Sequence, residues 1–127
     1  MIRPLLALEA ATDTVGVWTT LAQHIDKGES VSLLVEYRDR TVAAYLAYQI
    51  EDDGTTHVLR VLTAKPCQRQ GIARKLLLSV MAQAERVTLD VHITNHPALA
   101  LYGALGFEMD ALLSEGYVRC VWVKSVQ

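Results

Sequence analysis

The most constraining feature of the chain is a run of about thirty residues in which a strand pattern, a turn and an amphipathic helix follow one another. Residues 56–63 are rich in β-branched and large apolar side chains, as strands are. The helix after them is expected to run to residue 84 or 85. It carries one apolar stripe: Ile72, Leu76, Leu77, Val80, Met81 and Ala84. Such a unit packs its helix onto the sheet that holds the strand, so the sequence predicts a mixed α/β domain.

The turn between this strand and helix has a composition that suits an anion. It reads Gln68-Arg69-Gln70-Gly71-Ile72-Ala73, with small residues where a ligand could approach the backbone. The first turn of a helix has unpaired N–H groups and a partial positive charge, which favour phosphate. No Asp or Glu lies between Gly54 and Glu85, whereas five cations do: Arg60, Lys65, Arg69, Arg74 and Lys75. A phosphate or pyrophosphate site is therefore predicted; a merely basic surface helix is the alternative.

A second pattern lies downstream of the first. Residues 95–107 read N-x-x-A-x-x-L-Y-x-x-x-G-F, which includes Asn95, Tyr102 and Phe107. The turn pattern, of the form Q/R-x-x-G-x-G/A, and this second pattern occur in order and are separated by a helix and a strand. Together they resemble the GCN5-related N-acetyltransferase (GNAT) family. The resemblance is clear over residues 31–107 and weakest over the first thirty residues.

The resemblance implies a mixed α+β acyl-CoA N-acyltransferase fold, in which a twisted, mostly antiparallel sheet is splayed at its middle strands and flanked by helices. The residue patterns predict strands at 2–6, 31–37, 41–50, 56–63, 87–93, 107–113 and 117–124, with hairpin turns at 38–40 and 51–54. Helices are expected at 8–27, at 72–84 and from Pro97 to Gly106, the last capped by Thr94 or Asn95. The strand at 41–50 is apolar on both faces and is therefore expected at the centre of the sheet.

The cofactor implied by the resemblance is acetyl-CoA. The residues implied for its pyrophosphate are those of the turn: Gln68, Arg69, Gln70, Gly71, Ile72, Ala73 and Arg74. The main chain of Val61, Leu62 and Thr63 would pair with the pantetheine arm, and Asn95 would reach the pantetheine or phosphate region. Alternatives to cofactor binding stay open for three of these residues. Arg69 and Arg74 could be solvent-facing charges, and Asn95 could be a simple helix cap.

The predicted catalytic residue is Tyr102, because a phenol can stabilise or protonate the departing CoA sulfur. Family members often use a carboxylate on the central strand as the base, and strand 56–63 has none. His57 on this strand is the predicted base, since imidazole titrates near neutrality. His92 is the second candidate, and a water chain without a dedicated base is the third. For Tyr102, His57 and His92 alike, a purely structural role is the alternative.

Length and composition exclude several other classes. The 127 residues predict a single domain spanning 1–127. No apolar run is long enough for a bilayer and the start is no signal peptide, so a cytoplasmic protein without membrane contact is expected. The net charge of −2 and the lack of interleaved aromatics argue against nucleic acid. Cys67 and Cys120 indicate neither a disulfide framework nor a metal cluster, so no metal is expected.

Two functions from different classes are compatible with these patterns. One is an acetyl-CoA-dependent N-acetyltransferase whose acceptor is a primary amine on a small molecule, a peptide N-terminus or a lysine. The other is a catalytically idle GNAT-like domain that binds acetyl-CoA and regulates a protein partner. The closing strands, 107–113 and 117–124, are the expected contact surface if two copies form a homodimer. The sequence also leaves open a longer or different acyl group.

Overall fold

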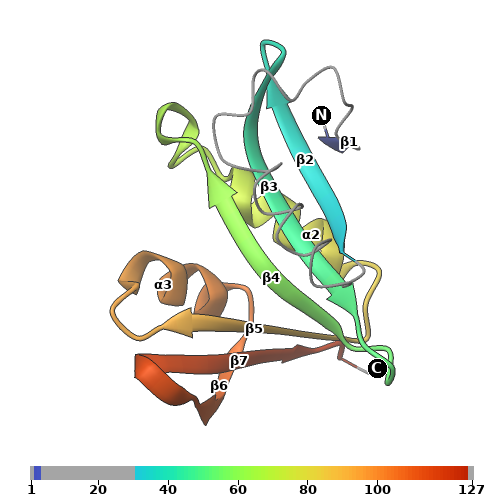
Figure 1. Cartoon of the computed structure of the whole chain (residues 1–127), viewed down its shortest axis with the longest axis vertical. Coiled ribbons are helices and arrows are strands. Elements are labelled where there is room, and N and C mark those ends of the chain that lie inside the picture. The colour runs from blue at the N-terminus through green and yellow to red at the C-terminus, as the bar shows by residue number, and fades with distance from the viewer. Residues whose placement is uncertain (1, 4–30, 126–127) are drawn as a thin grey trace.

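The structure is a computed structural model that describes residues 2–3 and 31–125. In this part of the chain one sheet has the order β1-β2-β3-β4-β5-β7-β6 (Figure 1). Its strands are β1 (Ile2–Arg3), β2 (Ser32–Arg38), β3 (Thr41–Ile50), β4 (Thr56–Thr63), β5 (Arg86–His92), β6 (Glu108–Leu112) and β7 (Tyr117–Val123). The helices are α2 (Ile72–Met81) and α3 (His96–Ala104), with short 3₁₀ turns η2 (Lys65–Cys67) and η3 (Ser114–Gly116). The expected helix at 8–27, and the end of the expected first strand, lie outside the described residues.

All neighbouring strands pair antiparallel except β4 and β5, which pair parallel. The predicted mixed fold with a mostly antiparallel sheet is therefore confirmed. The crossover from β4 to β5 passes through α2, as parallel neighbours require. None of the helices in the described residues is long and apolar enough to cross a bilayer.

Both predicted hairpins are present. In the β2–β3 turn, Asp39 and Arg40 have φ of 51° and 66°, a left-handed pair that matches the twist of a two-residue hairpin. In the β3–β4 turn, Gly54 has a φ of 87° and its N–H donates to the carbonyl of Glu51 at 2.9 Å. Between these turns, residues 42–47 of β3 are at most 1% exposed. The prediction of a central strand covered on both faces is confirmed.

The sheet has a face covered by α2 and α3, which we call the helix face, and an opposite face. The predicted stripe of α2 is buried on the helix face, where Ile72, Leu76 and Leu77 are at most 3% exposed. These side chains pack with Leu46 of β3 and Val58 of β4. A second cluster lies on the opposite face: Val35, Tyr37, Val42, Tyr45 and Ala47. The candidate site described below has one part on each of these two faces.

The sheet opens between β4 and β5. Leu59 has no partner on β3, because Ala47 faces Arg60 while Tyr48 faces Val58; it is therefore a β-bulge. The parallel pairing of β4 with β5 is confined to Thr56–Val87, His57–Thr88 and Val58–Leu89. Beyond this point the two strands diverge (Figure 1), and residues 60–63 pair with β3 alone among the described strands. The predicted splay of the middle strands is confirmed, and Val58 marks its vertex.

One local prediction was wrong. Helix α2 ends at Met81, three or four residues before the predicted end at residue 84 or 85. The N–H groups of Gln83 and Ala84 donate to the carbonyls of Val80 and Met81 at 3.1 and 3.3 Å, so the chain tightens and turns into β5. The predicted turn from β4 into the helix is present, and it includes η2, which contains Pro66.

A buried carboxylate joins β2 to α2. The side chain of Glu36 is fully buried on the helix face and accepts a hydrogen bond from Lys75 Nζ at 3.0 Å and another from Arg38. Burial opposes ionisation of this carboxyl. The hydrogen bonds to the carboxylate, of which the one from Arg38 contributes most, outweigh burial and lower the pKa of Glu36 from 4.5 to about 2.

This pKa predicts how stability depends on pH. Because the folded-state pKa is depressed, the stabilisation is present above the unfolded pKa and is lost as the pH falls from about 4.5 towards 2. Between pH 6 and pH 3 this corresponds to about 2 kcal/mol of unfolding free energy. We expect urea unfolding to show that loss in the wild type and not in Glu36→Gln. The exposed Glu108→Gln is the matched control and should behave as the wild type; an equal loss in Glu36→Gln would contradict the assignment.

Candidate functional site

A cavity of about 530 Å³ lies where β4 diverges from β5. We call it the splay cavity. Its lining comes from the end of β4, the glycine turn, the start of α2 and one side of α3: Val61, Leu62, Thr63, Cys67, Gln68, Arg69, Gly71, Ile72, Ala73, Arg74, Pro97 and Leu101. Nearly all the residues predicted from the sequence to bind a cofactor therefore gather around one cavity; Gln70, Asn95 and Tyr102 do not line it.

The turn at one end of the splay cavity presents backbone donors. Gly71 is the N-cap of α2 with a φ of 76°, and no side chain caps the helix. The first turn of α2 also has no acidic residue, so its N–H groups and its partial positive charge remain available to an anion. A Cβ at Gly71 would meet no atom within 4 Å, which shows that the space in front of the turn is open.

Two glutamines hold this turn in place. Gln68 Nε2 donates to the carbonyl of Thr63 at 3.1 Å, which ties the turn to the end of β4. Gln70 Nε2 donates to the carbonyl of Pro66 at 3.4 Å, so its side chain contacts the η2 turn and not the cavity. Arg69 lies between them with a φ of 65°. The side-chain contacts of both glutamines are thus structural, while Arg69 and Arg74 line the cavity as charged groups.

The other wall of the splay cavity comes from α3. Asn95 is its N-cap, with Oδ1 accepting from the N–H of Ala98 at 3.3 Å. The helix instead presents Pro97 and Leu101, four residues apart, to the cavity. The sequence reading missed these two residues and Cys67. The i, i+4 spacing of Pro97 and Leu101 was the available signal, because residues so spaced share one helix face.

Tyr102 lines a separate, apolar cavity of about 200 Å³ together with Leu99, Gly103, Phe107, Met109 and Cys120. Its ring lies 5.9 Å from the ring of Phe107, centroid to centroid. Burial and the neighbouring Cys120 raise the pKa of Tyr102 above its ordinary value. The phenol therefore stays protonated at neutral pH and can donate a proton or a hydrogen bond. Its chain neighbour Leu101 reaches the splay cavity.

Four polar side chains form a cluster on the opposite face of the sheet, beside the vertex of the splay. His57 Nδ1 lies 2.7 Å from Thr88 Oγ1, and His57 Nε2 lies 4.0 Å from Asp90 Oδ2. Arg119 Nε and Nη2 donate to Asp90 Oδ1 and Oδ2 at 2.8 and 3.1 Å. Hydrogen bonds from Arg119 hold the pKa of Asp90 below its usual range, so Asp90 is a carboxylate at neutral pH.

The sequence reading selected His57 but missed Asp90. Asp90 follows Leu89, the last β5 residue that pairs with β4, and therefore stands at the vertex. The sequence reading looked for a carboxylate only on strand 56–63. A polar residue inside the apolar strand Arg86–His92 was the signal that could have identified Asp90.

His92, the second candidate base, contacts Thr94 and Tyr117 and is not part of this cluster. Its Nδ1 lies 2.7 Å from Thr94 Oγ1, and its ring packs edge-on to Tyr117 at 5.1 Å. A Cβ at Gly116 would lie only 2.7 Å from His92 Nε2, so the loop after β6 closes against the ring. These contacts give His92 a role in holding that loop. Among the described residues, no three His, Cys, Asp or Glu side chains lie close enough together to hold a metal ion.

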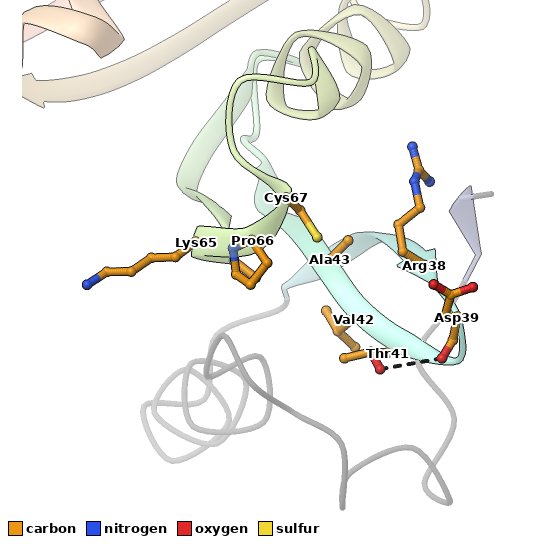
Figure 2. Close-up of a pocket in the computed structure, with 9 residues that line it drawn as sticks. Arg38, Asp39, Thr41, Val42, Ala43, Lys65, Pro66 and Cys67 are labelled. Atoms are coloured by element: carbon orange, nitrogen blue, oxygen red, sulfur yellow. Dashed lines mark hydrogen bonds between the residues drawn. The ribbon is translucent and has the colours of Figure 1, made fainter.

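A further cavity of about 590 Å³ lies between the β2–β3 turn and η2 and contains none of the predicted site residues. Val42, Ala43, Ala64, Pro66 and Cys67 form its apolar part. Lys65 extends away from the other lining side chains (Figure 2). Cys67 is its one lining residue in common with the splay cavity. Neither the uncapped helix start nor the polar cluster borders it.

Comparisons with solved structures agree on the fold. The structure of the ribosomal-protein-S18-alanine N-acetyltransferase from Escherichia coli superposes with a TM-score of 0.76 at 20% identity, covering 100% of this chain and 95% of that one. The PaiA N-acetyltransferase from Thermoplasma acidophilum in complex with coenzyme A gives 0.70 at 15% identity, covering 84% and 69%. NAA60 from Arabidopsis thaliana in complex with acetyl-CoA gives 0.71 at 13% identity, covering 97% of each chain. At these identities the likeness shows the fold.

Sequence comparison is informative at the level of the family. No curated protein matches the chain significantly. The sequence profile described as "Acetyltransferase (GNAT) family" matches residues 6–107, which is most of the chain and includes both sequence patterns. The chain therefore belongs to the acetyltransferase (GNAT) family.

Proposed function

We propose that the protein is an N-acetyltransferase that moves the acetyl group of acetyl-CoA to a primary amine by direct attack. The observation that carries the proposal is the splay cavity, which joins an uncapped helix start to an open strand edge. Membership of the family supports it, as do the related folds solved with coenzyme A or acetyl-CoA bound.

The cofactor fits the two ends of the cavity by its chemistry. A pyrophosphate needs several converging N–H donors, which the backbone at residues 70–74 supplies, and Arg69 and Arg74 add positive charge. The pantetheine arm carries amide groups, and the main chain of Val61, Leu62 and Thr63 offers it a strand edge that does not pair with β5; on this edge the Thr63 carbonyl accepts from Gln68 Nε2. In this arrangement the thioester would lie towards the vertex at Val58, where β4 and β5 stop pairing.

The acceptor amine would approach from the opposite face, because α2 and α3 cover the helix face. His57 Nε2 and Asp90 Oδ2 are 4.0 Å apart, so one ammonium nitrogen at about 3 Å can contact both atoms. Asp90 attracts the cation and His57 accepts its proton. The freed amine attacks the carbonyl carbon, a C–N bond forms and the C–S bond breaks. The proposed proton donor to the departing sulfur is Tyr102, whose α3 neighbour Leu101 lines the splay cavity.

The acceptor class remains a primary amine on a small molecule, a peptide N-terminus or a lysine. The relatives do not choose among these for this chain. The alternative of an idle regulator is not favoured, because His57 and Tyr102 can take the roles of proton acceptor and proton donor that we propose for them. We therefore retain the enzyme as the proposal.

Cofactor binding can be tested at Gly71. A Gly71→Asp variant places a carboxylate where the pyrophosphate would bind, and we expect calorimetry to show at least a 100-fold weaker affinity for CoA through charge repulsion. Gly54→Asp is a matched control, because Gly54 also has a positive φ, of 87°, and open space around its Cβ position. It lies in the β3–β4 turn and should bind CoA as the wild type does. Equal affinities for all three proteins would contradict the proposed pyrophosphate site.

The role of Tyr102 can be tested by removing one oxygen atom. Release of free thiol from acetyl-CoA across a panel of amines and peptides first identifies the best acceptor. With that acceptor, Tyr102→Phe should lower kcat by about 100-fold, since a general acid contributes that order of rate, and leave the Kd of acetyl-CoA unchanged. Tyr117→Phe serves as control and should retain full kcat. A kcat within twofold of the wild type in Tyr102→Phe would exclude Tyr102 as the proton donor.

A further inference from the structure

The polar cluster on the opposite face is built by the register of three adjacent strands. His57 of β4 pairs with Thr88 of β5, and Asp90 of β5 pairs with Arg119 of β7. Because side chains of paired residues emerge on the same face, this register forces the four side chains together. Three of these side chains remain partly open to solvent: His57 is 17% exposed, Asp90 30% and Arg119 40%.

Arg119 fixes the orientation of the Asp90 carboxylate. Its guanidinium donates from two nitrogens to the two carboxylate oxygens, at 2.8 and 3.1 Å. This fork geometry prevents rotation of the carboxylate, which a single charge such as Lys would permit. With both oxygens held, Oδ2 still lies 4.0 Å from His57 Nε2.

Thr88 and Asp90 place an oxygen atom near each ring nitrogen of His57. An imidazolium has two N–H donors, and each ring nitrogen already faces an oxygen: Nδ1 faces Thr88 Oγ1 at 2.7 Å and Nε2 faces Asp90 Oδ2. Thr88 is only 4% exposed, so water has little access to replace it. In the neutral ring that donates Nδ1–H to Thr88, Nε2 carries the lone pair that can accept a proton.

We propose that Arg119 is a positioning residue for proton removal from the acceptor amine: its guanidinium holds Asp90 as an oriented carboxylate, so that His57, and not Asp90, takes the proton. This inference rests on the proposed acetyl transfer. In the step, an N–H bond of the acceptor ammonium breaks and an Nε2–H bond forms on His57. The positive charge passes from the amine to the imidazole, and Asp90 stays ionised throughout.

The charges around the cluster decide in which direction the pH–rate profile moves when Arg119 is replaced. His57 faces Asp90, and Arg119 is influenced by Asp90, by Glu51 after β3 and by Asp110 of β6. Removal of the guanidinium leaves these carboxylates uncompensated, which favours the protonated imidazole. A protonated base is inactive, so the acid limb of the pH–rate profile must move to higher pH.

The experiment compares pH profiles of kcat/KM, measured with the best acceptor, for the wild type and four variants, of which His57→Gln removes the proposed base. Arg119→Met keeps the aliphatic stem and should move the midpoint of the acid limb upward by about 1 pH unit. Arg119→Lys restores the charge but not the fork, so its midpoint should return to the wild-type value while kcat stays several-fold lower. Arg86→Met removes an exposed arginine from β5 outside the cluster and should leave the profile unchanged.

The outcomes separate this inference from the proposed function. An unchanged acid limb in Arg119→Met, with an active wild type and unchanged CoA affinity, would overturn the role of Arg119 alone. An acid limb that survives in His57→Gln would also overturn it, because the titrating base would then be another group. A wild type that releases no thiol with any amine would overturn the proposed function, and the inference with it.

Discussion

The candidate site depends on the interruption of pairing between β4 and β5. Leu59 bulges from β4, and the parallel ladder stops at Val58. Had the ladder continued, the main chain of residues 60–63 would bond to β5 and the two strands would leave no room between them. The interruption instead exposes a strand edge inside a well-packed sheet, with a buried β3 behind it. Exposed edges tend to pair with another extended chain, and the pantetheine arm is the chain proposed here.

The same interruption gives the two faces of the sheet different roles. On the helix face, the start of α2 and the side of α3 form a cavity with backbone donors at one end. On the opposite face, the register of β4, β5 and β7 collects His57, Thr88, Asp90 and Arg119 beside the vertex. A cofactor and an acceptor can thus approach one point from two sides. The buried Glu36 carboxylate, paired to Lys75, holds α2 against β2 and so supports the cavity wall.

Local patterns identified most elements from the sequence, because hairpin turns and helix stripes depend on near neighbours. The hairpin strands, the α2 stripe, the Asn95 cap and the glycine turn all follow from such patterns. The bulge at Leu59 was different, since no glycine or proline marks that position and its exact place follows from the pairing with β3. Asp90 was missed for a related reason. Its proximity to His57 arises from a parallel register that brings together residues 33 positions apart.

Amide hydrogen exchange with and without acetyl-CoA tests the central claim most directly, because it reports on the open strand edge itself. Saturating acetyl-CoA should slow exchange at residues 61–63 and at 70–74, and leave the β3–β4 turn at 51–54 unchanged. Unaltered exchange at residues 61–63 would contradict binding of the cofactor in the splay cavity. So would slowed exchange only at the residues that line the cavity between the β2–β3 turn and η2.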